Sequence, residues 1–339
     1  MENLVIKSEK LLEMIEKIIK DYKVFAPVEE NEYSTFKQIE KAEEMNLEYL
    51  LPRIPTKSIF FKQTETLFKF SPGRKGVIKP IEIPKEEYVI FGIRPCDARS
   101  FTMLDPVFQG DYKDPFYNSK RENATLIGLS CNQPEINCFC TSFDDSPASS
   151  KNVDILFTDI SEKYFVEIVT EKGEKLISKI KALFESASKE DEDAKKKVEE
   201  EAIKSITRKM DLDGIVLKLD KMFDHELWHN TAMKCIGCGI CTYLCPTCHC
   251  FDMQDESTLD EGARIRVWDS CMYPEYTHHA SGHNPRPARM NRVRNRVYHK
   301  FSYFPKNSNV TACTGCGRCI DYCPANIDII DVIAKVGET

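Results

Sequence analysis

Apolar and polar residues alternate along this chain in patterns that predict both helices and buried strands. Between residues 2 and 22, leucines and isoleucines recur every three or four positions among lysines and glutamates, which predicts an amphipathic helix. Residues 87–93 and 124–129 are continuous apolar runs, which are typical of strands buried on both faces of a sheet. Shorter runs at 154–158 and 164–169 predict a pair of strands.

Weaker patterns assign the remaining segments. Residues 58–61 and 66–70 are short apolar runs that we interpret as strands. From residue 177 to about 209 the sequence is charged and helical, and we interpret it as the connection between two domains. We therefore predict an α+β protein, with an N-terminal domain of α/β character over residues 1–219 and a mainly helical domain over residues 220–339.

The composition bears on the compartment and on the class of partner. A net charge of −7 and a pI near 5.7 disfavour binding to nucleic acid or to a membrane surface, because both are anionic. The charged N-terminus lacks the apolar segment of a secretory signal, and no apolar run is long enough to span a membrane. We expect a soluble, cytoplasmic protein, in which fifteen cysteines indicate metal or redox chemistry rather than disulfides.

Two stretches near the C-terminus share one cysteine spacing, C-x2-C-x2-C-x3-C-P. This is the ligand spacing of bacterial ferredoxins, and two copies predict two [4Fe-4S] clusters in a ferredoxin-type domain. Structural zinc sites also use cysteine pairs, but they combine two separated pairs rather than a triplet, a fourth cysteine and a proline. The first run contains Cys235, Cys238, Cys241 and Cys245, and the second contains Cys313, Cys316, Cys319 and Cys323.

The fourth cysteine of each run is expected to ligate the cluster of the other run, as it does in two-cluster ferredoxins. The exchange would brace the two runs against each other. The predicted ligands of the first cluster are Cys235, Cys238, Cys241 and Cys323, and those of the second are Cys313, Cys316, Cys319 and Cys245.

Four further cysteines lie in the first two hundred residues, and two of them follow predicted strands. Cys96 comes shortly after the run 87–93, and Cys131 shortly after the run 124–129. In an open α/β sheet, ligand sites gather at the carboxyl ends of the strands. A third [4Fe-4S] cluster is therefore a hypothesis, and buried free thiols are the alternative. The candidate ligands are Cys96, Cys131, Cys138 and Cys140.

Three cysteines have no place in these ligand sets, namely Cys248, Cys250 and Cys271. We interpret them as buried thiols beside a cluster in preference to additional ligands. An arginine-rich segment separates the two runs, and a helix there would place Arg289, Arg292, Arg296 and Lys300 on one face. Such a face could offset the negative charge of the clusters or bind an acidic partner.

Four short motifs accompany the two cysteine runs, namely Arg94-Pro-Cys-Asp97, Cys138-Phe-Cys-Thr-Ser142, Cys245-Pro-Thr-Cys248 and His299-Lys-Phe301. Together with the runs, they resemble one family, the iron-sulfur β subunit of cytoplasmic sulfhydrogenases, which also includes the A subunit of the anaerobic sulfite reductase. The similarity extends over nearly the whole chain and is weakest in residues 1–80 and 180–215. Arg94 and Arg318, which lie within these motifs and runs, are predicted to bind a cofactor.

The resemblance implies a non-catalytic electron-transfer subunit of an oxidoreductase complex. Its partners would be a flavin subunit of the ferredoxin-reductase type that uses NAD(P)H, and a catalytic subunit. The catalytic subunit would be a nickel-iron hydrogenase or a sulfite reductase, and the sequence does not choose between them. An alternative is an iron-sulfur enzyme that acts directly on a thiol, disulfide or sulfur substrate at a cluster.

Overall fold

The computed structural model describes residues 3–71, 76–83 and 85–338, which form two compact units. The units interleave along the sequence, so that each is built from several segments. The first unit consists of Met1–Thr56, Lys85–Met210 and Thr314–Gly317; the second consists of Lys57–Pro84, Asp211–Cys313 and Arg318–Thr339.

The first unit is built on an eight-stranded sheet of strand order β10-β1-β9-β8-β7-β6-β2-β3. The four strands β2, β6, β7 and β8 run parallel to one another, and the flanking pairs are antiparallel. The strands are β1 (Leu4–Lys7), β2 (Lys23–Glu30), β3 (Tyr33–Ile39), β6 (Tyr88–Ile93), β7 (Ala124–Leu129), β8 (Ile155–Asp159), β9 (Lys163–Ile168) and β10 (Glu185–Ser186).

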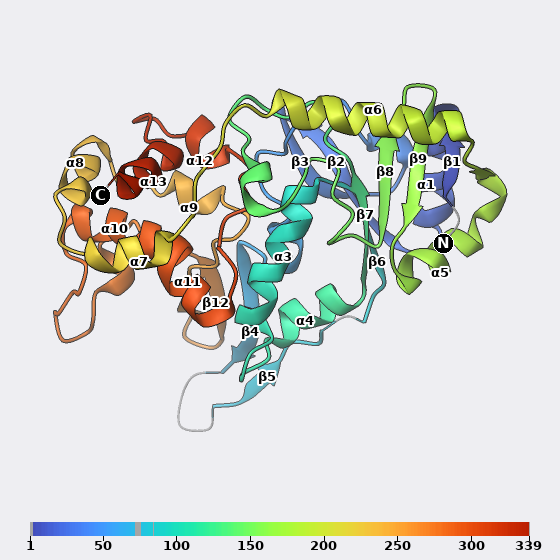
Figure 1. Ribbon diagram of the computed structural model, residues 1–339. Helices are drawn as coiled ribbons and strands as arrows, with labels where there is room; N and C mark the ends of the chain where they lie inside the picture. The colour runs from blue at the N-terminus through green and yellow to red at the C-terminus, as the bar shows by residue number, and fades with distance from the viewer. Residues whose placement is uncertain (1–2, 72–75, 84, 339) are drawn as a thin grey trace. The chain divides into compact units, whose positions relative to one another are not determined.

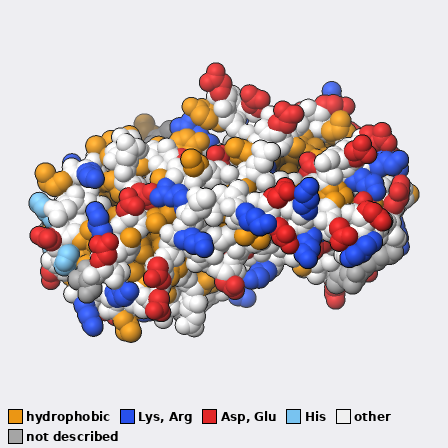
Figure 2. Space-filling view, turned by 45° about the horizontal axis from the view of Figure 1, so that its top comes forward, with side chains coloured by type: hydrophobic (Ala, Val, Ile, Leu, Met, Phe, Trp, Pro, Cys, Tyr) orange, Lys and Arg blue, Asp and Glu red, His pale blue; other side chains and the backbone are white. Residues whose placement is uncertain are grey.

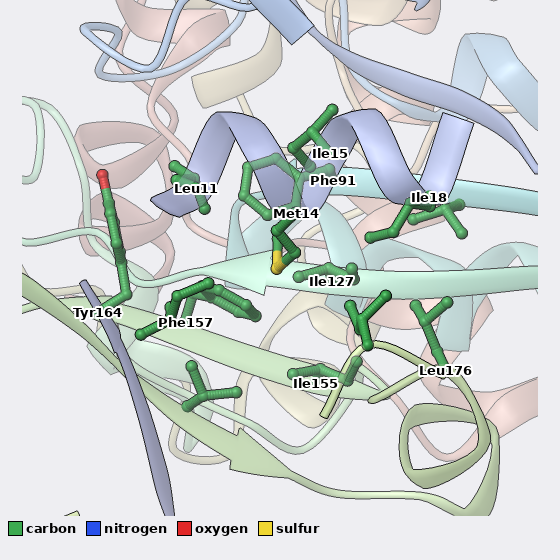
Figure 3. Close-up of a cluster of buried hydrophobic side chains, with 14 of the residues drawn as sticks. Leu11, Met14, Ile15, Ile18, Phe91, Ile127, Ile155, Phe157, Tyr164 and Leu176 are labelled. Atoms are coloured by element: carbon green, nitrogen blue, oxygen red, sulfur yellow. The ribbon is translucent and has the colours of Figure 1, made fainter. Parts of the chain in front are cut away.

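Helices cover both faces of this sheet (Figure 1). Leu11, Met14, Ile15 and Ile18 of α1 belong to the same core as Leu176 of α5, so both helices pack on one face. Figure 3 shows the α1 side chains pointing onto strand residues of this core. α3 and α6, which contact β7 and β9, cover the opposite face. The helices are α1 (Leu11–Ile19), α3 (Pro95–Phe108), α4 (Pro115–Glu122), α5 (Glu171–Lys179) and α6 (Lys189–Ser205).

The central strands explain where the first unit can bind a ligand. β6 and β7 are buried at every position, as expected for parallel strands covered on both faces. β6 leads through Arg94 into α3, which begins at Pro95, a residue favoured in the first helical turn. The carboxyl ends of β6 and β7 therefore deliver Cys96 and Cys131 to one edge of the sheet.

The second unit combines a small antiparallel sheet with short helices. Its strand order is β11-β12-β4-β5, from β4 (Thr64–Phe70), β5 (Ile78–Pro80), β11 (Phe251–Ser257) and β12 (Gly262–Trp268). None of the helices found in the described residues is long and apolar enough to cross a membrane. The helices of this unit are α2 (Lys57–Phe60), α7 (Ile215–Lys221), α8 (Leu227–Lys234), α9 (Ile240–Tyr243), α10 (Arg289–Tyr298), α11 (Phe304–Ser308), α12 (Arg318–Asp321) and α13 (Ile329–Gly337).

The predicted fold class is confirmed, and several local assignments are corrected. The helix expected over residues 2–22 begins only at Leu11, because the consecutive apolar residues 4–6 form a buried strand paired with β9 and β10. Residues 58–61 lie mainly in the short helix α2, not in a strand, since periodicity does not separate the two in so short an apolar run. The hairpin of β11 and β12 was not predicted, because β11 is exposed along its whole length and carries no apolar pattern.

Candidate iron-sulfur centres

The predicted ligands of the first cluster lie around one cavity of the second unit. Cys235, Cys238, Cys241 and Cys323 all line it, together with Cys319. Cys235 and Cys238 come from the loop between α8 and α9, Cys241 lies in α9, and Cys323 follows α12. The rest of the wall is largely apolar, including Ile236, Ile240, Met272, Val293, Val297, Ile327 and Val332.

Backbone geometry suits this cavity to a cluster. Gly237 and Gly239 both have φ of +75°, a conformation that glycine adopts without strain. A Cβ on Gly239 would lie 2.8 Å from the Tyr273 hydroxyl oxygen, so the close packing needs glycine. The Gly237 N–H donates to Cys235 Sγ at 3.4 Å, and the Ile327 N–H donates to Cys323 Sγ at 3.2 Å. Such N–H to sulfur bonds tune the potential of a bound cluster.

The donor set fits a cubane better than a single ion. Within the part of the chain that the structure describes, no three His, Cys, Asp or Glu side chains converge as the ligands of one metal ion do. In a [4Fe-4S] cluster each thiolate binds a different iron, so the ligand sulfurs stand further apart than they do around zinc. The four predicted ligand thiols, with Cys319 beside them, line one apolar cavity, which matches a cluster.

The second cysteine run is divided between the two units. Residues 314–317 belong to the first unit, where the Phe139 N–H donates to the Gly315 carbonyl oxygen at 2.8 Å. Cys245, Cys313 and Cys319 belong to the second unit, and Cys316 to the first. The ligand set Cys313, Cys316, Cys319 and Cys245 stays a prediction from the spacing.

Substitution of Gly315 by alanine is expected to destabilise the protein. Gly315 has φ of +68°, and a Cβ there would lie 2.6 Å from the backbone nitrogen of Cys140. The backbone strain and the clash together should lower the free energy of unfolding by at least roughly 2 kcal/mol. Denaturant unfolding measures the change, with Gly337→Ala as the control, because a Cβ at Gly337 meets nothing within 4 Å. An equal effect of the two substitutions would contradict the prediction.

A second cavity, in the first unit, brings the four N-terminal cysteines together. Cys96, at the start of α3, and Cys131, just after β7, line it with Cys138 and Cys140. Cys316 also lines this cavity, and Cys138 Sγ lies 3.9 Å from the Cys316 carbonyl oxygen. The edge of the sheet therefore gathers five thiols.

Burial controls the protonation of these thiols. Desolvation raises the pKa of Cys131 and Cys138, and it raises the pKa of Cys140 to about 12. Thiols in such a site stay protonated unless a metal supplies positive charge, and thiolate is the form that binds iron. The site can therefore hold either buried thiols or a cluster.

Arg94 holds the same edge of the sheet in place. Its guanidinium donates to the carbonyl oxygens of Leu50 at 3.1 Å and Ser130 at 2.6 Å, and also to those of Leu129 and Tyr49. Its charge lowers the pKa of Cys131, against the larger effect of burial. Arg94 lines the cysteine cavity, and Arg318 is almost fully buried, at 1% exposure. Cofactor binding by either arginine stays a prediction.

The arginine-rich segment is helix α10 and the π-helical turn that follows it, His299–Tyr303. Arg289 donates to the Cys235 carbonyl oxygen at 2.6 Å, and Arg296 donates to the Cys241 carbonyl oxygen at 3.2 Å. The charge of Arg296 lowers the pKa of the Cys319 thiol, against the larger effect of burial. Three arginines of α10 are thus buried cations rather than a solvated surface, namely Arg292, Arg294 and Arg296.

Lys300 contacts a predicted cluster ligand directly. It is 3% exposed, and its ammonium donates to Cys245 Sγ at 3.1 Å, Thr247 Oγ1 at 2.8 Å and the Ala312 carbonyl oxygen at 2.9 Å. These three bonds use all the hydrogens of the ammonium. The sequence placed Lys300 in the basic segment but did not predict this contact. Lys57, a second buried lysine of the same unit, gave no sequence signal at all.

The outer surface has no such concentration of one charge on the side drawn in Figure 2. Lys and Arg side chains are interspersed there with Asp and Glu side chains. The mixture agrees with the modest net charge of −7. On this face, an anionic polymer or headgroup layer meets no continuous basic surface.

Comparison with known proteins supports this interpretation of the cysteine runs. Residues 234–327 match the family described as the 4Fe-4S dicluster domain, which implies two [4Fe-4S] clusters in this part of the chain. The protein is therefore an iron-sulfur protein with a two-cluster domain. The chain is 32% identical over 317 residues to sulfhydrogenase 2 subunit beta of Pyrococcus furiosus, across 93% of this chain and 92% of that protein. It belongs to the family of sulfhydrogenase β subunits, which confirms the resemblance predicted from the motifs.

Proposed function

We propose that this chain is the electron-transfer subunit of a sulfhydrogenase-like complex, in which it relays single electrons through three [4Fe-4S] clusters. The observation that carries the proposal is the apolar cavity lined by Cys235, Cys238, Cys241 and Cys323, since a dry cage with few polar groups suits electron transfer. Two of the clusters follow from the dicluster domain. The third would occupy the cavity at the edge of the large sheet.

The partners proposed for the relay are the two that the family resemblance implies. A flavin subunit that uses NAD(P)H would exchange electrons at one end, and a hydrogenase or sulfite reductase subunit would do so at the other. Cys238 is exposed, so a cluster held by it would lie close to the protein surface, where an electron can cross to a partner. The protein used for comparison is itself named as one subunit of a sulfhydrogenase.

Reduction without turnover tests the relay. The chain, purified anaerobically with its clusters, is mixed with reduced viologen and then with sulfite, polysulfide or protons as the acceptor. We expect the visible absorbance of the clusters to bleach, with no steady consumption of viologen until a catalytic partner is added. Steady turnover by the isolated chain would contradict the proposal and favour the enzyme alternative.

Replacement of Lys300 by methionine is expected to lower the reduction potential of the cluster that Cys245 ligates. Loss of a buried positive charge disfavours the more negative, reduced cluster. At an effective dielectric of about 20 and a separation of about 6 Å, the effect is roughly 3 kcal/mol, or about 120 mV for one electron. A redox titration followed by EPR measures the shift.

Lys306 offers the matched control for this substitution. It is a lysine of α11, and its side chain is 45% exposed in an ion pair with Asp220. Water and salt screen a charge at such a position, so Lys306→Met should move neither potential by more than about 20 mV. Equal shifts in the two variants, or a rise of the potential in Lys300→Met, would contradict the prediction.

A further inference from the structure

A further cavity of the first unit lies beside the one that the N-terminal cysteines line. Its volume is about 420 Å³, which falls within the range of roughly 300–1,000 Å³ usual for small-molecule sites. All of its lining residues belong to the first unit. Leu50 and Arg94 line both cavities, whereas none of the cysteines lines this one. It is therefore a neighbour of the candidate third centre and not a part of it.

The strands of the large sheet place polar groups around this cavity. Ser130 directly follows β7, and Asp159 is the last residue of β8, so the cavity lies at the carboxyl ends of two parallel strands. Ligands of α/β sheets bind at this edge. Tyr164 of β9 lies opposite Asp159 in the antiparallel register, which puts both side chains on the same face of the sheet. A carboxylate and a phenol hydroxyl thus lie side by side in the wall of the cavity.

The hydroxyl of Tyr164 has no hydrogen-bond partner among the residues that the structure describes. Tyr164 is 9% exposed, and its ring centre lies 6.1 Å from that of Phe157. Figure 3 shows the ring at the margin of the hydrophobic core, with the hydroxyl pointing away from Phe157 and Ile155. Burial raises the pKa of Tyr164, so the hydroxyl keeps its proton. A buried hydroxyl without a partner, on the wall of a cavity, is a group that a bound ligand would satisfy.

Other polar groups of the cavity also keep unused hydrogen-bonding capacity. Asp159 Oδ1 accepts from the Ser161 N–H at 2.8 Å, and no described residue forms an ion pair with the Asp159 carboxylate. The Arg94 guanidinium, 6% exposed, donates to four carbonyl oxygens, which leaves one of its five N–H groups. Asn132 donates to the Asp159 carbonyl oxygen at 2.8 Å and keeps a second amide N–H. The cavity therefore offers both donors and acceptors.

Charge and hydrogen-bonding capacity together define the class of ligand. The carboxylates of Glu48 and Asp159 and the guanidinium of Arg94 give the lining a formal charge of −1, which disfavours phosphates and other anions. An ammonium group can only donate, and Arg94 repels it. A hydroxyl group both donates and accepts, so neighbouring hydroxyls can satisfy Asp159 and Tyr164 together. The apolar part of the wall consists of leucines, namely Leu47, Leu50 and Leu129.

We propose that this cavity binds a neutral small molecule whose ring carries adjacent hydroxyl groups, as a nucleoside or a sugar does. The hydroxyl groups bond Asp159 and Tyr164, and the rest of the ligand packs on the leucines. The bound ligand also contacts Arg94, which lines the cavity of the N-terminal cysteines as well. The inference goes beyond the electron relay and does not depend on it, because no cluster takes part in the binding.

Isothermal titration calorimetry of the full chain, purified anaerobically with its clusters, tests the site. The probes are adenosine, D-ribose, AMP and spermidine. We expect adenosine to bind at one site per chain and AMP to bind more weakly, because its phosphate meets the negative lining. Ribose bound as tightly as adenosine would assign the site to a sugar, and tighter binding of adenosine would assign it to a nucleoside. Tighter binding of AMP or spermidine, or no binding of adenosine and ribose at about 5 mM, would overturn the inference.

Variants of nearly unchanged shape locate the binding. Tyr164→Phe removes only the hydroxyl, and Asp159→Asn keeps an oxygen acceptor for the Ser161 N–H. Each should weaken the tighter of adenosine and ribose about five-fold or more, the usual effect of one lost hydrogen bond. Tyr112→Phe is the control, because Tyr112 is 94% exposed and does not line the cavity. Native affinity in both cavity variants, with the circular dichroism spectrum and the iron content of the native protein, would overturn the inference.

Discussion

Substitution of Cys323 by alanine is expected to remove about four irons per chain and to leave the other clusters in place. Cys323 belongs to the second cysteine run, yet it lines one cavity with Cys235, Cys238 and Cys241 of the first run. The lost cluster should therefore be that of the first run. Iron analysis and EPR of the dithionite-reduced protein measure the loss, and Cys248→Ala is a matched control in which no cluster ligand changes.

Double variants decide which cluster Cys323 serves. Because Cys235 and Cys323 are ligands of the same cluster, Cys235→Ala combined with Cys323→Ala should lose about four irons, no more than either single variant. Cys313→Ala combined with Cys323→Ala should lose about eight, since two clusters are then broken. The opposite pattern would show that each run ligates its own cluster and would contradict the exchange of fourth cysteines.

The sequence predicted local structure best where a single physical requirement, such as burial of a strand on both faces, decides which residues can stand at each position. The strand runs around β6 and β7 were predicted nearly to the residue, because a strand covered on both faces must be apolar throughout. The first ligand set stays a prediction from the ferredoxin spacing and its exchange of fourth cysteines, and its four members do line one cavity. The meeting of Cys96 and Cys131 at one sheet edge followed from the rule for parallel strands.

Features that depend on contacts distant in sequence were not predictable in the same way. We divided the chain by a single cut between residues 219 and 220, whereas its contacts group residues 57–84 with the second unit. The reason is that β4 pairs with β12, almost two hundred residues later, and no local pattern announces that pairing. Lys57 lies at the start of this segment, and its ammonium donates to the carbonyl oxygen of Cys248 in the cysteine-rich region. Nothing in the sequence around Lys57 predicts a partner so distant in the chain.

Substitution of Cys138 by alanine is expected to remove about four irons from a native content of about twelve. Cys138 is 8% exposed in the cavity lined by Cys96, Cys131 and Cys140. Its replacement would leave one iron of a cluster without its thiolate ligand, and water does not readily take the place of that ligand at a buried position. Ile136→Ala is the control, because Ile136 is 84% exposed in the same loop and does not line the cavity. If the four cysteines are buried thiols, both proteins will contain about eight irons and the substitution will change nothing in the EPR spectrum.

The fifth thiol of that cavity makes the ligand set itself testable. Cys316 is predicted to serve the second cluster, although it lines the cavity of the N-terminal cysteines. Two substitutions in the ligand set of one cluster lose no more iron than one does, whereas substitutions in two clusters add their losses. If Cys138 and Cys316 serve different clusters, Cys138→Ala combined with Cys316→Ala should therefore lose about eight irons. A loss of only about four would place Cys316 on the third cluster. The second cluster would then keep only Cys313, Cys319 and Cys245 of its four predicted ligands.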